Sequence, residues 1–168
     1  MTTALAPVQV LGLPLMPYTY AQTLARIDEL VQARVPSYFI TANLNYAMCC
    51  DADPRLHTVN AHAAFLVADG MPLVWWSRWC AQRLPERIAG SDLLFSICEQ
   101  AAQKGYRVFL LGAAPGVAEA AGKALQARYP GLLIVGTECP PFRALSADEI
   151  REQQERVRAT KPDILFAA

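Results

Sequence analysis

Six short apolar runs alternate with longer stretches of helical periodicity along this chain of 168 residues. The segments between the runs carry helix caps and apolar stripes, as where Thr19 precedes the amphipathic stretch 20–32. Strands that alternate with helices at this spacing predict an α/β fold, with a Rossmann-like, layered, mostly parallel sheet and helices on both faces. The runs predicted as strands are 8–15, which Pro14 interrupts, 38–41, 64–68, 106–111, 132–135 and 163–168.

The composition is that of a chain with a well-filled core. Hydrophobic residues make up 54% of the sequence and charged residues 18%, and a chain of this length buries roughly 70% of the surface that its unfolded form exposes. We therefore expect a single domain over residues 1–168. The formal net charge is zero and no basic run occurs, which argues against nucleic acid as a partner.

Cysteine usage and hydropathy bear on where the protein works. The five cysteines include no C-x-x-C pair, and the N-terminus lacks the features of a secretory signal. Free thiols in the cytoplasm are the expected state. No run approaches the roughly 20 apolar residues that cross a bilayer, so we expect any membrane contact to be peripheral.

One of the predicted strands ends in an acid. The apolar run Phe65–Ala68 is followed at once by Asp69 and Gly70, and open α/β sheets bind ligands along the carboxyl ends of their strands. Asp69 is therefore a candidate general base, since apolar walls raise the pKa of a carboxylate toward the working range. An aspartate is equally typical of an N-cap, here for the helix that starts at Met71, and the pattern leaves both roles open.

Further polar residues are expected near the same edge of the sheet. Thr41 and Asn43 follow the preceding strand and are placed to hydrogen-bond a sugar or a phosphate, although turn chemistry is the commoner use of asparagine. Arg87 precedes a helix that Ser91 or Asp92 is predicted to cap. A guanidinium beside a helix N-terminus suits a phosphate, and an exposed loop arginine is the alternative.

A glycine-containing turn, Gly112–Gly116, connects the strand 106–111 to the following helix. Such a turn lets the diphosphate of a nucleotide approach the backbone. It matches neither G-x-G-x-x-G nor a Walker loop, and tight strand-to-helix turns use glycine in any case. Gly112 and Gly116 are candidates for substrate binding on this pattern.

The sequence offers no convincing metal site. Asp51 and Asp53 form a D-x-D pair, but Pro54 directly after Asp53 favours a helix cap with Pro54 as the first helical residue. His57 and His62 are five residues apart, which points them to different faces of a helix. No cysteine pair supports zinc, and we expect neither a metal nor another cofactor.

Three tryptophans, Trp75, Trp76 and Trp79, are concentrated near Arg78 and Arg83. A buried helix with an aromatic face is the favoured interpretation. The same residues are also typical of a surface that meets lipid head groups or a lipid-linked substrate, or of a subunit contact in a homo-oligomer.

Five short motifs follow one another in the order Thr41–Asn45, Val67–Pro72, Pro85–Asp92, Phe109–Gly116 and Arg128–Leu132. The series resembles the WecG/TagA/CpsF family of bacterial glycosyltransferases over almost the whole chain. The pieces LPERIAGSDLL and ADGMP are the most specific. Chance agreement of several ordered motifs with matching spacing does not account for the resemblance.

The resemblance implies an inverting glycosyltransferase that needs no metal. Members of that family move a sugar from a nucleotide-sugar donor, usually a UDP-sugar, to a polyprenyl-diphosphate-linked saccharide in the biosynthesis of surface polysaccharide, teichoic acid and exopolysaccharide. They act at the inner face of the plasma membrane. Carried over by position, Asp69 would be the general base with Thr41 as a second catalytic residue. Asn43 would line the substrate pocket with Thr41, Arg87 would offset the charge of the donor diphosphate, and the turn from Gly112 would face the nucleotide.

The chain departs from the family pattern at its end. Family members continue past the last strand with a G-x-P-x-Q-E-like segment that helps to bind the nucleotide sugar, and many add a basic appendage for membrane contact. This sequence stops at Ala168, so we expect a glycosyltransferase domain without its C-terminal part. The rival hypothesis is a truncated, non-catalytic nucleotide- or partner-binding α/β domain. A Rossmann-type oxidoreductase ranks below both because its glycine pattern is missing.

Overall fold

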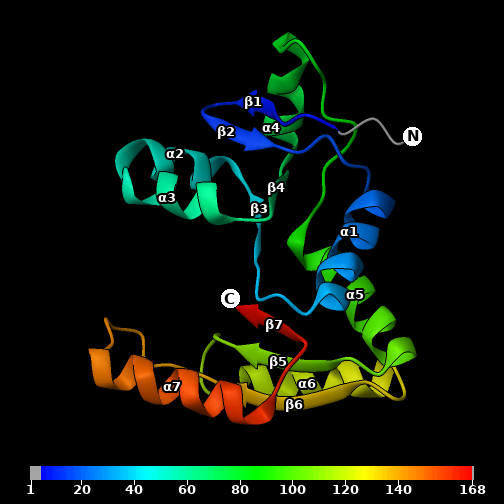
Figure 1. The fold of residues 1–168 in the computed structure, drawn as a ribbon, viewed down its shortest axis with the longest axis vertical. Coiled ribbons are helices and arrows are strands. Elements are labelled where there is room, and N and C mark those ends of the chain that lie inside the picture. Colours follow the sequence, from blue (N-terminus) through cyan, green and yellow to red (C-terminus); the bar gives the residue numbers. More distant parts are fainter. Residues whose placement is uncertain (1–4, 168) are drawn as a thin grey trace. The chain divides into compact units, whose positions relative to one another are not determined.

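A computed structural model describes residues 5–167 of the chain (Figure 1). These residues fall into two compact units, one up to Leu93 and one from Leu94. Each unit contains helices and a mostly or wholly parallel sheet, so the predicted α/β class is confirmed. The strands of the described residues form two separate sheets, one of four strands and one of three. The single domain expected over residues 1–168 stays a prediction.

The sheet of the first unit has the order β1-β2-β4-β3, with β1 and β2 antiparallel and the other pairs parallel. The single strand predicted over 8–15 is wrong. Leu11 and Gly12 both take a positive φ, 48° and 78°, and two such residues form the tight turn of a hairpin. The strands are β1 (Val8–Val10), β2 (Leu13–Leu15), β3 (Phe39–Ala42) and β4 (Phe65–Ala68).

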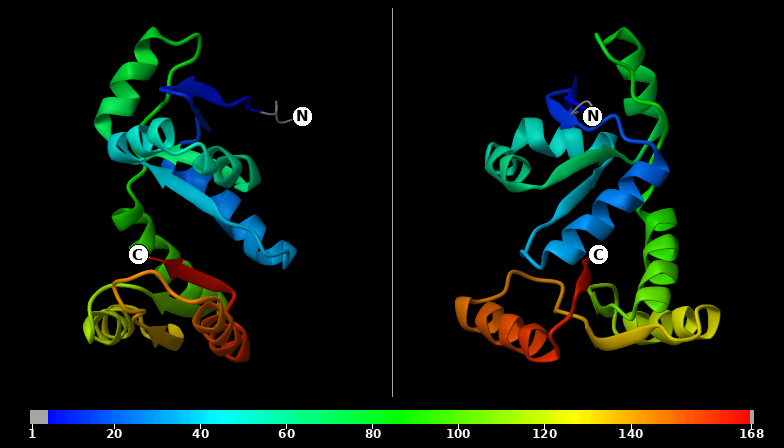
Figure 2. Two further views of the ribbon diagram at one scale, coloured as in Figure 1. Left: turned by 90° about the vertical axis from the view of Figure 1, so that its left-hand side faces the viewer. Right: turned by 45° about the vertical axis from the view of Figure 1, so that its right-hand side comes forward.

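Helices lie on both sides of β3 and β4, with α1 on one side and α2 and α3 on the other (Figures 1 and 2). Thr19 caps α1 in a capping box with Gln22, as its position predicts. No helix was predicted over α2, because turn chemistry was the favoured role of Asn43 at its start. The helices are α1 (Tyr20–Ala33), α2 (Leu44–Ala52), α3 (Arg55–His62) and α4 (Met71–Trp76), followed by the short 3₁₀ helix η1 (Ser77–Trp79).

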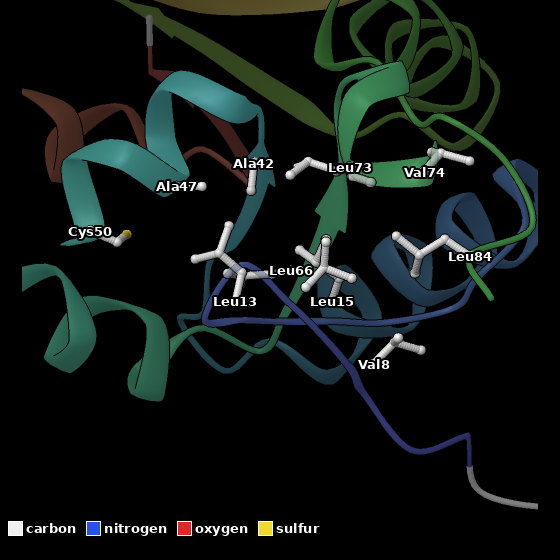
Figure 3. Close-up of a cluster of buried hydrophobic side chains, with 12 residues drawn as sticks. Val8, Leu13, Leu15, Ala42, Ala47, Cys50, Leu66, Leu73, Val74 and Leu84 are labelled. Atoms are coloured by element: carbon white, nitrogen blue, oxygen red, sulfur yellow. The ribbon is translucent and has the colours of Figure 1, made fainter. Parts of the chain in front are cut away.

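The core of the first unit surrounds β4, whose four residues are all buried. Leu66 and Ala68 belong to a cluster that joins the hairpin, α2 and α4 (Figure 3). Phe65 points to the opposite face, because side chains alternate along a strand, and its ring stacks on that of Phe39 with centroids 5.0 Å apart. Packing on both faces fixes the carboxyl end of β4, where Asp69 follows. The other buried members of the cluster are Val8, Val10, Leu13, Leu15, Ala42, Ala47, Cys50, Leu73, Val74 and Leu84.

The second unit has a parallel sheet of order β6-β5-β7. Its core forms where Val108 and Leu110 of the central strand pack with Cys98 of α5 and Leu125 of α6. The strands predicted over 106–111, 132–135 and 163–168 are found, with β6 extending to Glu138, and Ser146 caps α7 in a capping box with Glu149. The elements are α5 (Gly90–Lys104), which begins in the first unit, β5 (Arg107–Leu111), α6 (Val117–Arg128), β6 (Leu133–Glu138), α7 (Ala147–Thr160) and β7 (Ile164–Ala167).

The aromatic segment is helical, but its tryptophans are not buried. Trp75, Trp76 and Trp79 expose 51%, 50% and 81% of their surface. The favoured interpretation of a buried aromatic face is therefore wrong. Among the described residues, no helix combines the length and the apolar character needed to cross a membrane.

Candidate active site

Asp69 follows β4 directly, and its carboxylate is partly buried. The N-cap residue of α4 is Gly70, and no side chain caps that helix, so the interpretation of Asp69 as its N-cap is wrong. The backbone N–H of Gly90 instead donates to Asp69 Oδ2 at 2.9 Å. Gly90 is the first residue of the 15-residue helix α5, and the N-terminal end of a helix dipole stabilises a negative charge placed there.

Only one of the two carboxylate oxygens of Asp69 accepts a hydrogen bond within the described residues. Among the described residues, the Gly90 N–H is the only donor recorded for the Asp69 side chain, and it binds Oδ2. The carboxylate is therefore held at one oxygen, while Oδ1 retains its lone pairs. A carboxylate oriented in this way is suited to accept a proton from a bound hydroxyl.

Thr41 lies beside this pair. It stands on β3 one residue before the strand ends, and Ala42 is in register with Ala68 on β4. A Cβ placed on Gly90 would lie 2.9 Å from Thr41 Oγ1 and 3.5 Å from Asp69 Oδ2. Three residues from separate elements thus converge at the carboxyl edge of the sheet, as the positions of Thr41 and Asp69 predict.

Gly90 is the member of this cluster that the sequence does not reveal. It contributes a backbone N–H. Because glycine has no Cβ, it also avoids a collision with the Thr41 hydroxyl. The one signal in the sequence is a glycine at the point where the loop motif PERIAG passes into a helix. Glycine at such a point is consistent with close approach of the backbone to another group.

The segment 84–90, which leads into α5, is anchored at every second residue. Ile88 and Ala89 are also buried, so the segment is held both by packing and by hydrogen bonds. Four hydrogen bonds hold it: Leu84 N–H to Ser77 Oγ at 3.0 Å, Tyr20 N–H to Glu86 Oε1 at 2.8 Å, Ile88 N–H to Ala68 O at 2.7 Å, and Gly90 N–H to Asp69 Oδ2.

Arg87 lies between two of these anchoring residues and is exposed. Its guanidinium pairs with Asp92 in the first turn of α5 at 3.3 Å. The predicted capping of the helix by Ser91 or Asp92 is wrong, because α5 already begins at Gly90. Arg87 nevertheless stands beside a helix N-terminus, and an exposed ion pair contributes so little stability that a phosphate can replace Asp92 at small cost.

Asn43 has the structural role that its residue type favours. Its side-chain oxygen accepts from the Tyr46 N–H at 2.9 Å and caps α2. It also lies near Asp69, because Asp69 N–H donates to Ala42 O at 2.7 Å and a Cβ on Gly70 would lie 4.0 Å from Asn43 Cβ. The cap uses only the amide oxygen of Asn43, so its amide nitrogen remains a donor at this edge.

The turn 112–116 belongs to the second unit. Gly112 is buried with a φ of 118°, and its N–H donates to Glu138 O at 2.8 Å. Gly116 has a φ of 81° and precedes α6 as its N-cap residue. Both backbone conformations favour glycine. A contact of Gly112 and Gly116 with substrate stays a prediction.

Asp53 of the D-x-D pair is bound to an arginine. Its carboxylate accepts from Arg55 Nε at 2.9 Å and from Arg55 Nη2 at 2.7 Å, and these hydrogen bonds lower the pKa of Asp53 to about 2. The predicted start of the helix at Pro54 is one residue early, since α3 begins at Arg55. No group of three or more potential metal ligands occurs among the described residues.

The sequence of this chain is similar to those of proteins in one known family. The sequence matches the model of the glycosyl transferase WecG/TagA/CpsF family over residues 8–168. A Bacillus spizizenii protein named N-acetylglucosaminyldiphosphoundecaprenol N-acetyl-beta-D-mannosaminyltransferase is 31% identical over 132 residues, which are 79% of this chain and 49% of that protein. A Staphylococcus aureus protein of the same name is 36% identical over 166 residues, 96% of this chain and 62% of that protein. The chain therefore spans less than two thirds of the length of either relative.

Proposed function

Because this chain belongs to the WecG/TagA/CpsF family of glycosyltransferases, we propose that it transfers a sugar from a nucleotide-sugar donor, a UDP-sugar, to a polyprenyl-diphosphate-linked saccharide. The two relatives are named for the transfer of an N-acetyl-beta-D-mannosaminyl group to N-acetylglucosaminyldiphosphoundecaprenol. The structural observation that carries the proposal is the convergence of Asp69, Thr41 and Gly90 at the carboxyl edge of the first sheet.

Asp69 is the general base in this proposal. Its Oδ2 is held by the Gly90 N–H, so Oδ1 takes the proton of the acceptor hydroxyl. The acceptor oxygen then attacks the anomeric carbon of the donor, the bond from that carbon to the diphosphate oxygen breaks, and UDP leaves with the electron pair. Attack opposite the leaving group inverts the anomeric configuration. General-base assistance of this kind contributes roughly 10²–10⁴-fold to a rate.

Thr41 and Asn43 supply the polar groups around the base. The Thr41 hydroxyl lies next to the Asp69–Gly90 pair, where it can hydrogen-bond the acceptor hydroxyl and align it with Oδ1. The Asn43 amide nitrogen is a donor for a sugar oxygen. Thr41 lies in β3, and Asn43 is the N-cap residue of α2, so the backbone at both positions is fixed. Side chains on a fixed backbone lower the entropy cost of aligning two substrates.

The charge of the leaving diphosphate is met by Arg87 and by backbone N–H groups. Fixed donors and cations aimed at developing charge are among the largest contributions to catalysis. Arg87 gives up its exposed pair with Asp92 to bind a phosphate of the donor. Gly112 and Gly116 are proposed to face the nucleotide through the backbone of their turn. The mechanism requires neither a metal nor another cofactor, and its place is the inner face of the plasma membrane.

The proposal is tested with purified protein, UDP-N-acetylhexosamines and a short-chain lipid analogue of N-acetylglucosaminyl diphosphate. The expected result is a product one N-acetylhexosamine heavier than the acceptor, with release of one UDP for each product formed. UDP binding by calorimetry without transfer from any such donor would favour the alternative of a non-catalytic nucleotide-binding domain.

Replacement of Arg87 by alanine is expected to weaken donor binding. Loss of a charge-assisted hydrogen bond to phosphate corresponds to roughly a tenfold or larger rise in the KM for the UDP-sugar. The melting temperature should stay unchanged, because the Arg87–Asp92 pair is exposed. Arg26→Ala is the matched control, since Arg26 also forms an exposed ion pair, with Glu29 on α1. Equal KM values for the UDP-sugar in Arg87→Ala and wild type would show that Arg87 does not bind the donor.

A further inference from the structure

Three exposed tryptophans gather on α4 and η1. Trp75 and Trp76 are the last two residues of α4 and Trp79 is the last residue of η1, and the rings of Trp76 and Trp79 meet edge to face with centroids 6.3 Å apart. These three residues are called the tryptophan patch below. Aromatic side chains of this size normally bury most of their surface, and a cluster of them in solvent marks an interaction surface.

The opposite side of the same segment already fills the core. Leu73, Val74 and Ser77 are buried, and the two apolar residues belong to the cluster shown in Figure 3. Ser77 Oγ donates to Val74 O at 2.7 Å and accepts from Leu84 N–H. The segment is thus anchored through its buried face. The exposed tryptophans are not needed for this packing and are accessible to an external partner.

The surroundings of the patch are cationic. Arg78 and Arg83 are both exposed, and the sequence contains no acidic residue between Asp69 and Glu86. Among the described residues, neither arginine takes part in an ion pair. The patch therefore combines interfacial aromatic rings with two uncompensated positive charges, in a chain whose formal net charge is zero.

We propose that the tryptophan patch docks the protein on an anionic phospholipid bilayer. Tryptophan rings are enriched at the level of lipid head groups, where one part of the ring is in an apolar medium and the N–H is hydrated. Arginines beside them are attracted to anionic head groups. A second copy of the chain is a poorer occupant, because a symmetric contact through this patch would bring the arginines of both copies together without counter-charges.

This inference goes beyond the proposed function, although the choice of a bilayer rests on it in part, since a polyprenyl-linked acceptor lies in a membrane. The two are tested separately. Lipid binding is measured without sugar substrates, and transfer is measured with a short-chain acceptor in the absence of vesicles. Failure of one assay therefore leaves the other interpretable.

The tryptophan patch contains every tryptophan of the sequence, so tryptophan fluorescence, excited at wavelengths where tyrosine does not absorb, reports on this surface alone. Vesicles of phosphatidylglycerol are expected to shift the emission to shorter wavelength and to protect it from acrylamide. Acyl chains brominated near the head group should quench it. Phosphatidylcholine vesicles should give a smaller shift, and added salt should weaken binding to the anionic vesicles because it screens the arginines.

Variants separate the charge from the rings. Arg78→Gln and Arg83→Gln are each expected to lower the partition coefficient for anionic vesicles by about fivefold, while Arg158→Gln, at an exposed arginine of α7, should leave it unchanged. Trp79→Ala should reduce binding several-fold, and Phe142→Ala, which removes a fully exposed ring elsewhere, should not. Circular dichroism checks that each variant is folded.

Three results would overturn the proposal. Emission that does not respond to either vesicle would exclude membrane contact of the patch. Equal binding to neutral and anionic vesicles would remove the role of the arginines. A shift to shorter wavelength that depends on protein concentration without lipid would assign the tryptophan patch to a subunit contact instead.

Discussion

Asp69→Asn is expected to abolish glycosyl transfer while the melting temperature stays close to that of the wild type. The amide oxygen of asparagine can still accept the Gly90 N–H that Asp69 Oδ2 binds at 2.9 Å, so the junction between β4 and α5 persists. An amide does not take up a proton, however, and the acceptor hydroxyl loses its base. The expected fall in kcat is about 10²–10⁴-fold.

Three measurements on the same preparation decide this prediction: kcat, the melting temperature and UDP affinity. Asp51→Asn is the matched control, because it neutralises an exposed carboxylate of α2 outside the proposed site, and its kcat should equal that of the wild type. Asp69→Ala should lose activity and also stability, by about 1–3 kcal/mol, since the partly buried Gly90 N–H is left without an acceptor. A wild-type kcat for Asp69→Asn would show that another group is the base.

Gly90→Ala is expected to destabilise the protein and to inactivate it. Replacement of a helical glycine by alanine usually stabilises a protein by roughly 0.5–1 kcal/mol. Here the new Cβ would lie 2.9 Å from Thr41 Oγ1, so either the Thr41 side chain or the start of α5 must shift. We expect a net loss of about 1–3 kcal/mol, together with displacement of the Asp69 carboxylate and a loss of kcat of at least tenfold.

The helix α6 supplies the control for this substitution. A Cβ on Gly122 would meet Ile134 Cγ2 at 3.6 Å and Leu110 Cδ1 at 3.7 Å, which are ordinary contacts, so Gly122→Ala should raise the melting temperature. The double variant Thr41→Ala/Gly90→Ala removes the colliding hydroxyl and should recover stability without recovering transfer. Thermal unfolding would contradict the steric account if Gly90→Ala proved as stable as Gly122→Ala.

The α/β class could be predicted because strand and helix periodicities are local properties of the sequence. The hairpin at Leu11 could not, since leucine rarely takes a positive φ and its pattern continues the strand. The helix α2 was missed for a related reason: its apolar residues do not fall on one face, so the periodicity that indicates a helix is absent.

The candidate site was predictable where it depends on side chains at strand ends. Asp69 and Thr41 stand out because an acid and a hydroxyl follow apolar runs. Gly90 contributes an N–H that almost every residue possesses, and only the folded chain shows which N–H reaches the carboxylate. The exposure of the tryptophans was mispredicted because hydrophobic character favours burial, while the core beneath them is already complete without their rings.

The alternating anchors of the segment 84–90 fix its length. Irregular connections are normally the places where a chain accepts inserted or deleted residues. In this segment, one additional residue between Glu86 and Gly90 would turn the following anchoring groups away from their partners, as a shift of one residue does in a β-strand. The hydrogen bond from Ile88 N–H to Ala68 O would be lost, and so would the hydrogen bond from Gly90 N–H to Asp69 Oδ2. The length of the segment 84–90 thus determines where α5 begins relative to Asp69, the proposed base.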